Sequence, residues 1–496
     1  MSSHRGGGTD RSRRPRRMDA GSGLLALMLA AVTAPAWGLW DTGLTEPGGD
    51  SATVGTHDHA TCPACAAGHS HSHHHHGHSH HDYGDTVGFA DFQILTRWSQ
   101  TAQQPRGSTL GNPTQLTWGF AQEGSTIIST RESEETGPSS LIEFLDGIRD
   151  PASTGGADLT QRAWFGIFEQ AFGRIDELSG VSYTYEPNDD GIDISGRVNS
   201  GTLGQVGVRP DVRIGGHLID GQSNPNVIAY NYFPSAGDMV LDTGNVSTFS
   251  STFLDNLQFR QVIMHEALHG LGLQHVESNN SRQLMEPFLD ISFDGPQFDD
   301  ILALHRNYGD AYEEDGGNDN AFTATEFGVL RAGDAVAVGT DARSTSAVVT
   351  PDMTDFISIS GINDEDWFSF TITEPAATIT ATLTPKGPTY NQGPQGGEQA
   401  PLVTDALNDL RLELIDDPLD FFFNETALAV ADDTIAGGSE ILANLVLDPG
   451  EYFLRVTGSI DDVQMYRLDL TFIPEPATIA TLLASTVLLR RRRRRL

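Results

Sequence analysis

Large apolar side chains recur with a helical period over residues 160–178. This spacing puts them on one face of a helix, and it predicts a core face that packs on a sheet. The positions concerned are Trp164, Ile167, Phe168, Ala171, Phe172 and Ile175. A second long helix is predicted over residues 252–271, because Thr252 and Asp255 have the three-residue spacing of a capping box.

Short alternating runs bounded by glycine, asparagine or proline predict strands in both halves of the chain. In the first half they are residues 116–120, 182–185, 192–194, 227–232 and 239–241. In the second half, where no helical period intervenes, they are residues 367–371, 379–383, 410–415, 427–431, 442–447 and 452–456. We therefore expect an α+β domain followed by an all-β antiparallel sandwich.

The N-terminal residues have the pattern of a secretory signal peptide. Arginines precede the apolar run 24–32, which leads to the small residues Ala34-Pro35-Ala36. A charged region, a short apolar region and a small-residue cleavage site are typical of export signals. The apolar run is shorter than the roughly 20 residues that a membrane-spanning helix needs.

The C-terminal residues combine Pro474-Glu475-Pro476, the apolar stretch 477–489 and six arginines at 490–495. A short tail anchor with its positive charges in the cytoplasm is one interpretation. The order of the three parts resembles the PEP-CTERM sorting signal of Gram-negative bacteria. That resemblance implies recognition by an exosortase, only transient contact with the membrane, and delivery to the cell surface or the extracellular matrix.

The chain is strongly acidic. Among its 496 residues, 67 acidic side chains against 30 basic ones give a formal net charge of -37. Nucleic acid is therefore excluded as a partner, because its phosphates would be repelled. The charge is consistent with solubility or with calcium binding.

Residues 37–88 are low in complexity and have no apolar period, so we expect a disordered segment. Eleven histidines lie between His57 and His81, most of them after Cys62 and Cys65. Such a segment can collect zinc or copper, and its cysteines can form a disulfide after export. The alternatives are an inert solvated tail and a cysteine that occupies and blocks a metal site elsewhere in the chain.

Residues 265–275 carry the principal chemical signal. They read HEALHGLGLQH and match H-E-x-x-H-x-x-G-x-x-H at every fixed position. Residues four apart in a helix share one face, so His265 and His269 can bind a single ion. Glu266 lies beside that ion and can take a proton from a metal-bound water as the general base.

Gly272 and His275 extend this motif beyond a chance pair of helical histidines. Gly272 can adopt a left-handed conformation that ends the helix and brings back His275 as the third ligand. Three protein ligands with an open fourth position are typical of a catalytic zinc site. The sequence therefore predicts one catalytic Zn²⁺.

The extended motif resembles that of the metzincin proteases and, among them, the matrixins. Residues 284–287 (LMEP) are similar to the matrixin Met-turn, which implies that Met285 lies beneath the zinc. Residues 297–309 resemble the closing matrixin helix, and residues 237–242 resemble a segment before the active-site helix. The resemblance implies a twisted mixed sheet with an active-site helix. It also implies peptide hydrolysis by zinc-activated water, on a substrate that extends along an edge strand.

Three positions show how closely the chain follows the matrixin pattern, and it departs from that pattern at two of them. Val240 stands where the family has a histidine of a second, structural zinc site, so we expect no such site. Asp242 matches a calcium ligand of the family, which implies Ca²⁺ there, although the sequence does not identify its other ligands. Val276 replaces the usual serine after the third ligand. The cysteine-containing pro-segment motif PRCGxPD of many matrixins is also missing from the sequence.

The runs DEDWFSF, LRLELID, LDPGEYFLRVTG and YRLDL resemble the bacterial pre-peptidase C-terminal domain, an accessory β-sandwich of secreted proteases. The predicted organisation is a signal peptide (1–36), a disordered histidine-rich segment (37–88), a matrixin-like zinc protease domain (89–310), a linker (311–325), a β-sandwich (326–472) and a PEP-CTERM signal (473–496).

The sequence thus predicts an exported zinc endopeptidase that acts on proteins or peptides at the surface or in the matrix of a Gram-negative bacterium. The alternative is a surface or matrix zinc-binding protein with a vestigial protease domain, which the histidine-rich segment favours. The intact Glu266 favours the enzyme. A metzincin that acts on glycoproteins differs from the first hypothesis only in substrate.

Overall fold

The computed structural model describes residues 94–104, 109–129, 134–152, 155–196, 202–221, 226–416 and 427–473. All of them belong to one compact unit, Thr42–Leu496. The predicted signal peptide, the histidine-rich segment with Cys62 and Cys65, and the predicted sorting signal lie outside the described residues. Within the described ranges, no helix has the length and apolar character that a membrane crossing requires.

The N-terminal half is built on a five-stranded mixed sheet with the strand order β4-β1-β5-β7-β6. Four of these strands are parallel, and β6 runs antiparallel to β7 at one edge. The predicted mixed sheet is therefore confirmed. Its strands are β4 (Val181–Tyr185), β1 (Thr114–Phe120), β5 (Val212–His217), β7 (Met239–Asp242) and β6 (Ala229–Asn231).

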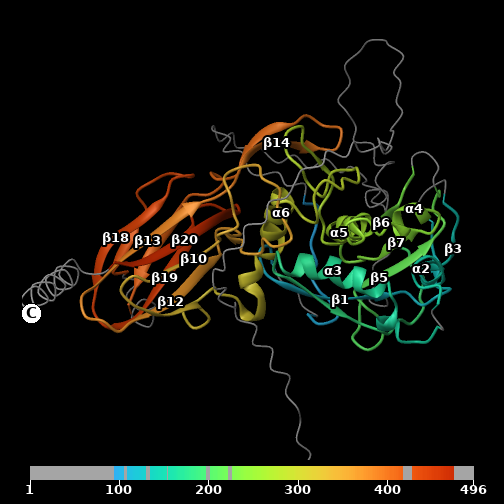
Figure 1. Cartoon of the computed structure of the whole chain (residues 1–496), viewed down its shortest axis with the longest axis horizontal. Coiled ribbons are helices and arrows are strands. Elements are labelled where there is room, and N and C mark those ends of the chain that lie inside the picture. The colour runs from blue at the N-terminus through green and yellow to red at the C-terminus, as the bar shows by residue number, and fades with distance from the viewer. Residues whose placement is uncertain are drawn as a thin grey trace, which may run out of the picture. The chain divides into compact units, whose positions relative to one another are not determined.

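Helices α3 (Phe165–Asp176) and α5 (Leu257–Gly270) pack against each other and against this sheet (Figure 1). The predicted apolar stripe on α3 is buried along its whole length, which confirms its role in the core. Trp118 of β1 stacks on Phe172 of α3 with ring centroids 4.8 Å apart. The remaining elements of this half are β2 (Thr126–Ile127), β3 (Gly137–Pro138), α2 (Leu141–Arg149), the 3-10 turn η1 (Leu159–Gln161), α4 (Val246–Ser250) and α6 (Phe298–Tyr308).

The predicted start of the active-site helix is wrong. The helix begins at Leu257 rather than at residue 252, and no side chain caps it. Leu254, Asp255 and Asn256 have φ angles of 46°, 54° and 65°, so the preceding turn is left-handed. Arg260 donates to the carbonyl oxygen of Asp255 at 2.7 Å and helps to hold this turn.

Two further predictions about the sheet need correction. Residues 192–194 form no strand, and Ile194 makes only a single bridge to Ile127. Strand β5, which lies at the centre of the sheet, was not predicted, because Gly215 and Gly216 interrupt its apolar pattern. A Cβ atom on Gly216 would lie 2.9 Å from the carbonyl oxygen of Leu241 in β7, so glycine allows this close approach.

The C-terminal half is an all-β domain of two five-stranded sheets, as predicted. One sheet has the order β10-β20-β13-β18, with β11 also paired to β20, and the other has the order β17-β16-β19-β12-β9. Strand β13 alternates buried and half-buried side chains along its length, and residues from both sheets share one apolar core. The strands are β9 (Thr325–Leu330), β10 (Ala335–Val338), β11 (Ile357–Ile359), β12 (Glu365–Ile372), β13 (Ala377–Pro385), β16 (Leu410–Ile415), β17 (Ala429–Ala431), β18 (Glu440–Leu447), β19 (Gly450–Gly458) and β20 (Gln464–Ile473).

A third small sheet joins the two halves. Its order is β15-β14-β8, in which β14 (Thr389–Pro394) and β15 (Ala400–Val403) come from the second half. Strand β8 (Val276–Glu277) directly follows the third predicted zinc ligand. Between the halves, the predicted linker contains the 3-10 helix η2 (Ala311–Gly316), and its side chains Glu313 and Asn318 are buried.

Candidate metal centre and active site

Helix α5 presents His265 and His269 one turn apart, and the chain reverses directly after it. Gly272 has a φ of 97°, as the motif predicted. A Cβ atom at this position would lie 1.8 Å from the carbonyl oxygen of Thr96, so no other residue fits the turn. The reversal brings His275 back to the two histidines of the helix.

The three imidazoles converge on one point. The Nε2 atom of His275 lies 3.1 Å from Nε2 of His265 and 3.1 Å from Nε2 of His269. Zinc bound tetrahedrally at about 2.0–2.1 Å from each nitrogen would separate such atoms by about 3.3 Å. The histidine group therefore has the size of a zinc site.

Each ring is oriented by an oxygen atom at its other nitrogen. Nδ1 of His265 lies 2.7 Å from the carbonyl oxygen of Leu284, and Nδ1 of His269 lies 2.7 Å from that of Leu273. A carbonyl oxygen can only accept, so Nδ1 carries the proton in both rings and Nε2 carries a lone pair. Lone pairs that face one another at this distance repel unless a cation lies between them, which fits a metal ion.

Burial keeps the histidines in the form that binds metal. It lowers the pKa of His265 to about 4. Burial, together with the neighbouring charge of His265, lowers the pKa of His275 to about 3. The rings are therefore neutral at neutral pH, and no proton competes with a cation for Nε2.

Glu266 lies on the same helix and is 7% exposed. Its Oε2 atom is buried and makes no hydrogen bond with the described residues. Burial raises the pKa of this carboxyl to about 8. A buried carboxylate oxygen without a partner is costly for stability, so its presence beside three metal-ligating nitrogens indicates a function.

Met285 is buried, and the turn that contains it is held by Asp300 of α6. The place of Met285 beneath the metal stays a prediction. The carboxylate of Asp300 accepts from the backbone N–H groups of Leu284 at 2.7 Å and of Met285 at 3.1 Å. Leu284 is also the residue whose carbonyl orients His265. The sequence predicted the turn but not the role of Asp300.

The sequence also did not predict the residue that contacts the ring of His275, the third metal ligand. Nδ1 of His275 lies 3.0 Å from Oε1 of Gln395, a residue in the turn between β14 and β15 of the C-terminal half. Residues 120 positions apart meet here. A sequence pattern within the protease half contains no signal for such a contact.

Asp242 is fully buried at the end of β7. Its Oδ1 accepts from the backbone N–H groups of Ile219 at 3.0 Å and Gly244 at 2.9 Å, and its Oδ2 accepts from Nδ2 of Asn245 at 2.8 Å. Calcium at Asp242 stays a prediction, and these N–H groups already occupy both oxygens. Val240 occupies the position at which matrixins have a histidine of the structural zinc site. Its side chain is buried in an apolar cluster.

The two lone histidines of the protease half have structural contacts. Nε2 of His217 lies 2.6 Å from a carboxylate oxygen of Glu134, which also accepts from the hydroxyl of Tyr230. His305 is enclosed between the carbonyl oxygen of Leu178 and the hydroxyl of Ser358. These contacts hold both rings within the core, and both nitrogens of His305 have a partner.

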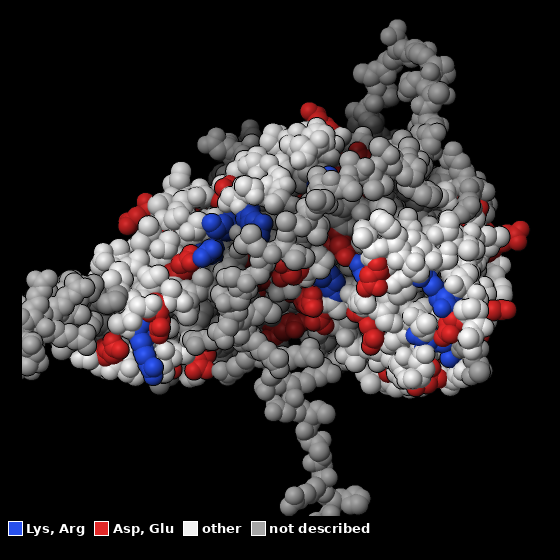
Figure 2. Space-filling view, in the orientation of Figure 1, with Lys and Arg blue, Asp and Glu red and all other residues white. Residues whose placement is uncertain are grey.

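A second group of side chains could hold a metal ion. Glu313, Asp319 and Asp364 bring one carboxylate oxygen each to within 4.8 Å of the others. Burial, followed by the charges of neighbouring carboxylates, raises the pKa of Glu313. Both amide atoms of the buried Asn318 make no hydrogen bond with the described residues. Acidic groups also outnumber basic ones on the face drawn in Figure 2.

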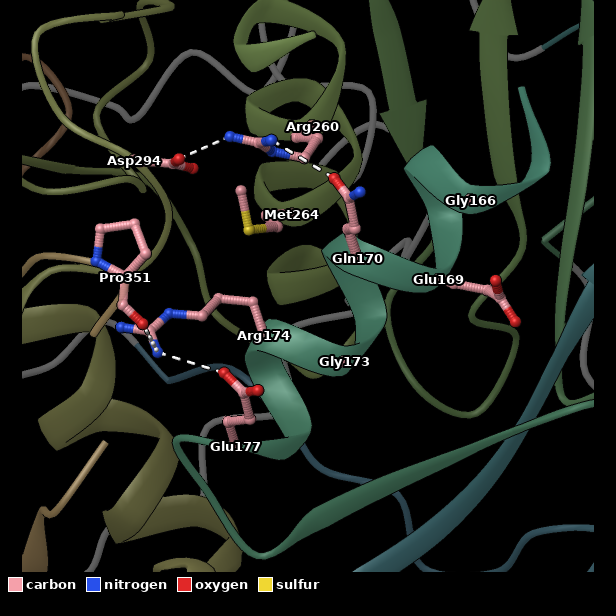
Figure 3. A pocket seen from close by; sticks show the side chains of 10 residues that line it. All are labelled: Gly166, Glu169, Gln170, Gly173, Arg174, Glu177, Arg260, Met264, Asp294 and Pro351. Atoms are coloured by element: carbon pink, nitrogen blue, oxygen red, sulfur yellow. Dashed lines mark hydrogen bonds and ion pairs between the residues drawn. The ribbon is translucent and has the colours of Figure 1, made fainter. Parts of the chain in front are cut away.

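A cavity of about 490 Å³ is lined by residues of α3 and α5 (Figure 3). It is lined by Arg260 and Met264 of α5 and by Arg174 of α3, rather than by the metal-ligating histidines. Arg174 donates to the carbonyl oxygens of Pro351 at 3.3 Å and Met353 at 2.9 Å. The cavity thus lies at the junction with the second half and is separate from the metal centre.

Comparison with known proteins agrees with this geometry. The family model of matrixin, Peptidase_M10, matches residues 157–309, which include all three histidines. Among solved structures, the chain is similar to the pre-peptidase C-terminal domain of a collagenase from Bacillus anthracis. The identity is 14%, over 30% of this chain and 94% of that chain, with a TM-score of 0.17. No curated protein matches the chain.

Proposed function

Because residues 157–309 belong to a matrixin metalloendopeptidase domain with a zinc-binding histidine triad, we propose that the chain hydrolyses protein substrates outside the cell, with Glu266 as the general base. The observation that carries this proposal is the buried Oε2 atom of Glu266, on the helix that bears His265 and His269. This atom makes no hydrogen bond with any residue that the structure describes. A merely structural carboxylate at this depth would be paired.

Zinc, when bound, supplies the Lewis acidity that polarises a scissile carbonyl and lowers the pKa of water to about 7. The side chains of the site hold the metal ion and transfer protons. His265, His269 and His275 present three neutral nitrogens, and Glu266 takes a proton from the attacking water. The same carboxyl group can pass that proton to the amine that leaves when the peptide C–N bond breaks.

The substrate is proposed to lie in an extended conformation along β6. This strand ends the sheet, so within the described residues only its β7 side is paired. The ring of Phe233, which follows β6, contacts the ring of His269 at a centroid distance of 5.9 Å. An extended peptide on this edge would be bound through its backbone near the metal, and side-chain pockets would set the specificity.

The proposal that the chain is exported and sorted to the cell surface rests on the sequence patterns at its two ends. The pattern of residues 1–36 supports secretion, and the Pro-Glu-Pro, apolar and arginine parts of residues 473–496 support processing by an exosortase. We therefore place the enzyme at the surface or in the extracellular matrix of a Gram-negative bacterium. Its substrates would be proteins present there.

Calcium is proposed to bind at Glu313, Asp319 and Asp364. Oxygen ligands are the ones that Ca²⁺ prefers, and carboxylates close to one another are stabilised when a cation neutralises them. Within the described residues, no lysine or arginine forms an ion pair with any of the three. Asn318 directly precedes Asp319 in the sequence. Its side-chain amide makes no hydrogen bond with the described residues, so its oxygen is a candidate ligand.

The decisive experiment measures cleavage of casein by the full chain with zinc, beside Glu266→Ala and Glu266→Asp. We expect Glu266→Ala to lower kcat/KM by about 10²–10⁴-fold, the usual contribution of a general base. Glu266→Asp keeps the carboxylate and should retain part of the activity. Zinc content is measured on each sample, so a loss of metal is distinguished from a loss of the base.

Two outcomes contradict the proposal. If Glu266→Ala retains the activity of the native chain, the mechanism is wrong. If the native chain binds zinc at the triad but cleaves nothing, the vestigial, zinc-binding protein is the better description.

A further inference from the structure

The β14–β15 hairpin extends from the C-terminal domain onto the protease half (Figure 1). Among the described residues, strand β14 pairs with neither sheet of the sandwich. Instead it runs antiparallel to β8, with Gly393 opposite Glu277 and Pro394 opposite Val276. Val276 is the residue directly after the third zinc ligand. The hairpin is therefore attached to the backbone of the metal site itself.

Side chains fasten the hairpin to the protease half along its length. The hydroxyl of Tyr390 donates to Oδ1 of Asp299 at 2.6 Å, and both residues are buried. If the hairpin moved away, Oδ1 of this buried carboxylate would lose its hydrogen bond, which would lower the stability of the fold. The interaction therefore holds the hairpin in this position. Further contacts join Gln392 to Asp299, Asn391 to Asn279 and Asn280, and Gln399 to Asn279.

The turn of the hairpin points Gln395 at the metal site. Gly397 donates its N–H to the carbonyl oxygen of Pro394 at 2.8 Å, which closes a four-residue turn. Gly396 has a φ of 68°, as the third position of a type II turn requires. Gln395 occupies the second position, and its Oε1 lies 3.0 Å from Nδ1 of His275.

We propose that Gln395 is a positioning residue for the third zinc ligand, so that the C-terminal domain completes the active site. This inference rests on the proposed zinc-dependent function. His265 and His269 are oriented by carbonyl oxygens of the protease half, whereas His275 depends on a side chain of the other domain. The Gln395 oxygen fixes the Nδ1–H tautomer of His275, aims Nε2 at the metal and increases its basicity.

The test measures metal affinity on the full chain rather than activity alone. Metal-free protein is titrated with Zn²⁺ against a competing chromophoric chelator, and with Co²⁺ to record the visible absorption of the site. His275→Ala provides the baseline, because other histidines in the chain can also bind metal. The variants are Gln395→Ala, Gln395→Glu and Gln399→Ala.

We expect Gln395→Ala to weaken zinc binding at the triad by about 10–100-fold and to change the Co²⁺ spectrum. Gln395→Glu keeps an oxygen acceptor at the same reach, so it should restore native affinity. Gln399→Ala is the matched control, because this glutamine lies on the same hairpin but contacts Asn279 instead of His275. Its affinity should equal that of the native chain.

Native affinity in Gln395→Ala would overturn the inference, and so would an equal loss in Gln399→Ala, which would assign the effect to docking of the hairpin. Failure of Gln395→Glu to restore the affinity would also count against it. Failure of the native chain to bind zinc above the His275→Ala baseline would instead refute the proposed function.

Discussion

Within the residues that the structure describes, two groups of side chains could hold metal ions, and they differ in how well their polar atoms are satisfied when no ion is bound. At the histidine triad, every Nδ1 atom lies beside an oxygen acceptor and burial keeps the rings neutral. In the acidic group, Glu313 and Asp364 are carboxylates that lack a cationic partner within the described residues.

This difference indicates what each ion would do. A neutral nitrogen site costs little stability when empty, so the triad can be formed in advance and its metal serves the reaction. In the acidic group Glu313 is buried and Asp319 is exposed, and carboxylates this close to one another are stabilised when they are protonated or bound to a cation. We therefore expect zinc to control catalysis and calcium to control stability, each with little influence on the other.

The largest expected effect is that of removing one zinc ligand. His269→Ala should lower kcat/KM by more than about 10³-fold, because two histidines do not hold a catalytic zinc ion. The increase of Tm on addition of calcium should persist in this variant, and this control shows that the fold is intact. Activity above a tenth of the native value would contradict the assignment of the triad.

The next effect concerns calcium. At a calcium concentration of 100 times Kd, the native chain should gain about 2.7 kcal/mol of unfolding free energy. Glu313→Gln should lose most of that gain, as measured by thermal unfolding with and without a calcium chelator. Glu326→Gln, at an exposed position of β9, is the matched control and should keep the full gain. An equal gain in both variants would show that calcium does not bind at the acidic group.

A smaller effect is expected from pH. Burial raises the pKa of Asp364 from 3.8 to about 6, so the folded protein holds this proton more tightly than the unfolded chain does. Without calcium, the contribution of Asp364 is therefore favourable below about pH 4 and is lost as the pH rises to about 6. The difference in unfolding free energy between the native chain and Asp364→Asn should change over this window. Saturating calcium should suppress the change, and a flat difference without calcium would contradict the shifted pKa.

The same two groups also explain how far the sequence could predict the structure. The triad and Glu266 lie within eleven consecutive residues, so helical spacing and one glycine turn determine their geometry locally. In the acidic group, Glu313 and Asp319 precede β9 and Asp364 precedes β12, and these two strands pair in parallel. A pairing between distant strands leaves no periodic signal in a single sequence.

Long-range contacts account for the other failures as well. The start of α5 was misplaced, because the left-handed turn at residues 254–256, where Arg149 of α2 donates to Oδ1 of Asn256 at 2.7 Å, takes precedence over a local capping pattern. Strand β5 was missed, because its glycines serve the close packing of neighbouring strands rather than a turn. Gln395 was missed, because its partner is 120 residues away. In each case tertiary packing outweighed local propensity.

The smallest predicted effect tests how the first zinc ligand is held from within the protease half. Asp300→Asn keeps the shape of the side chain, but its neutral amide is a weaker acceptor for the N–H groups of Leu284 and Met285. The carbonyl oxygen of Leu284 would then orient His265 less firmly. We expect zinc affinity to fall by up to about 10-fold, the lower end of the range for groups that orient metal ligands. Chelator competition measures this change, and the calcium-dependent rise in Tm should stay native. A lower Tm with native zinc affinity would assign Asp300 to stability of the fold alone, whereas a loss of both responses would mean that the zinc and calcium sites are coupled.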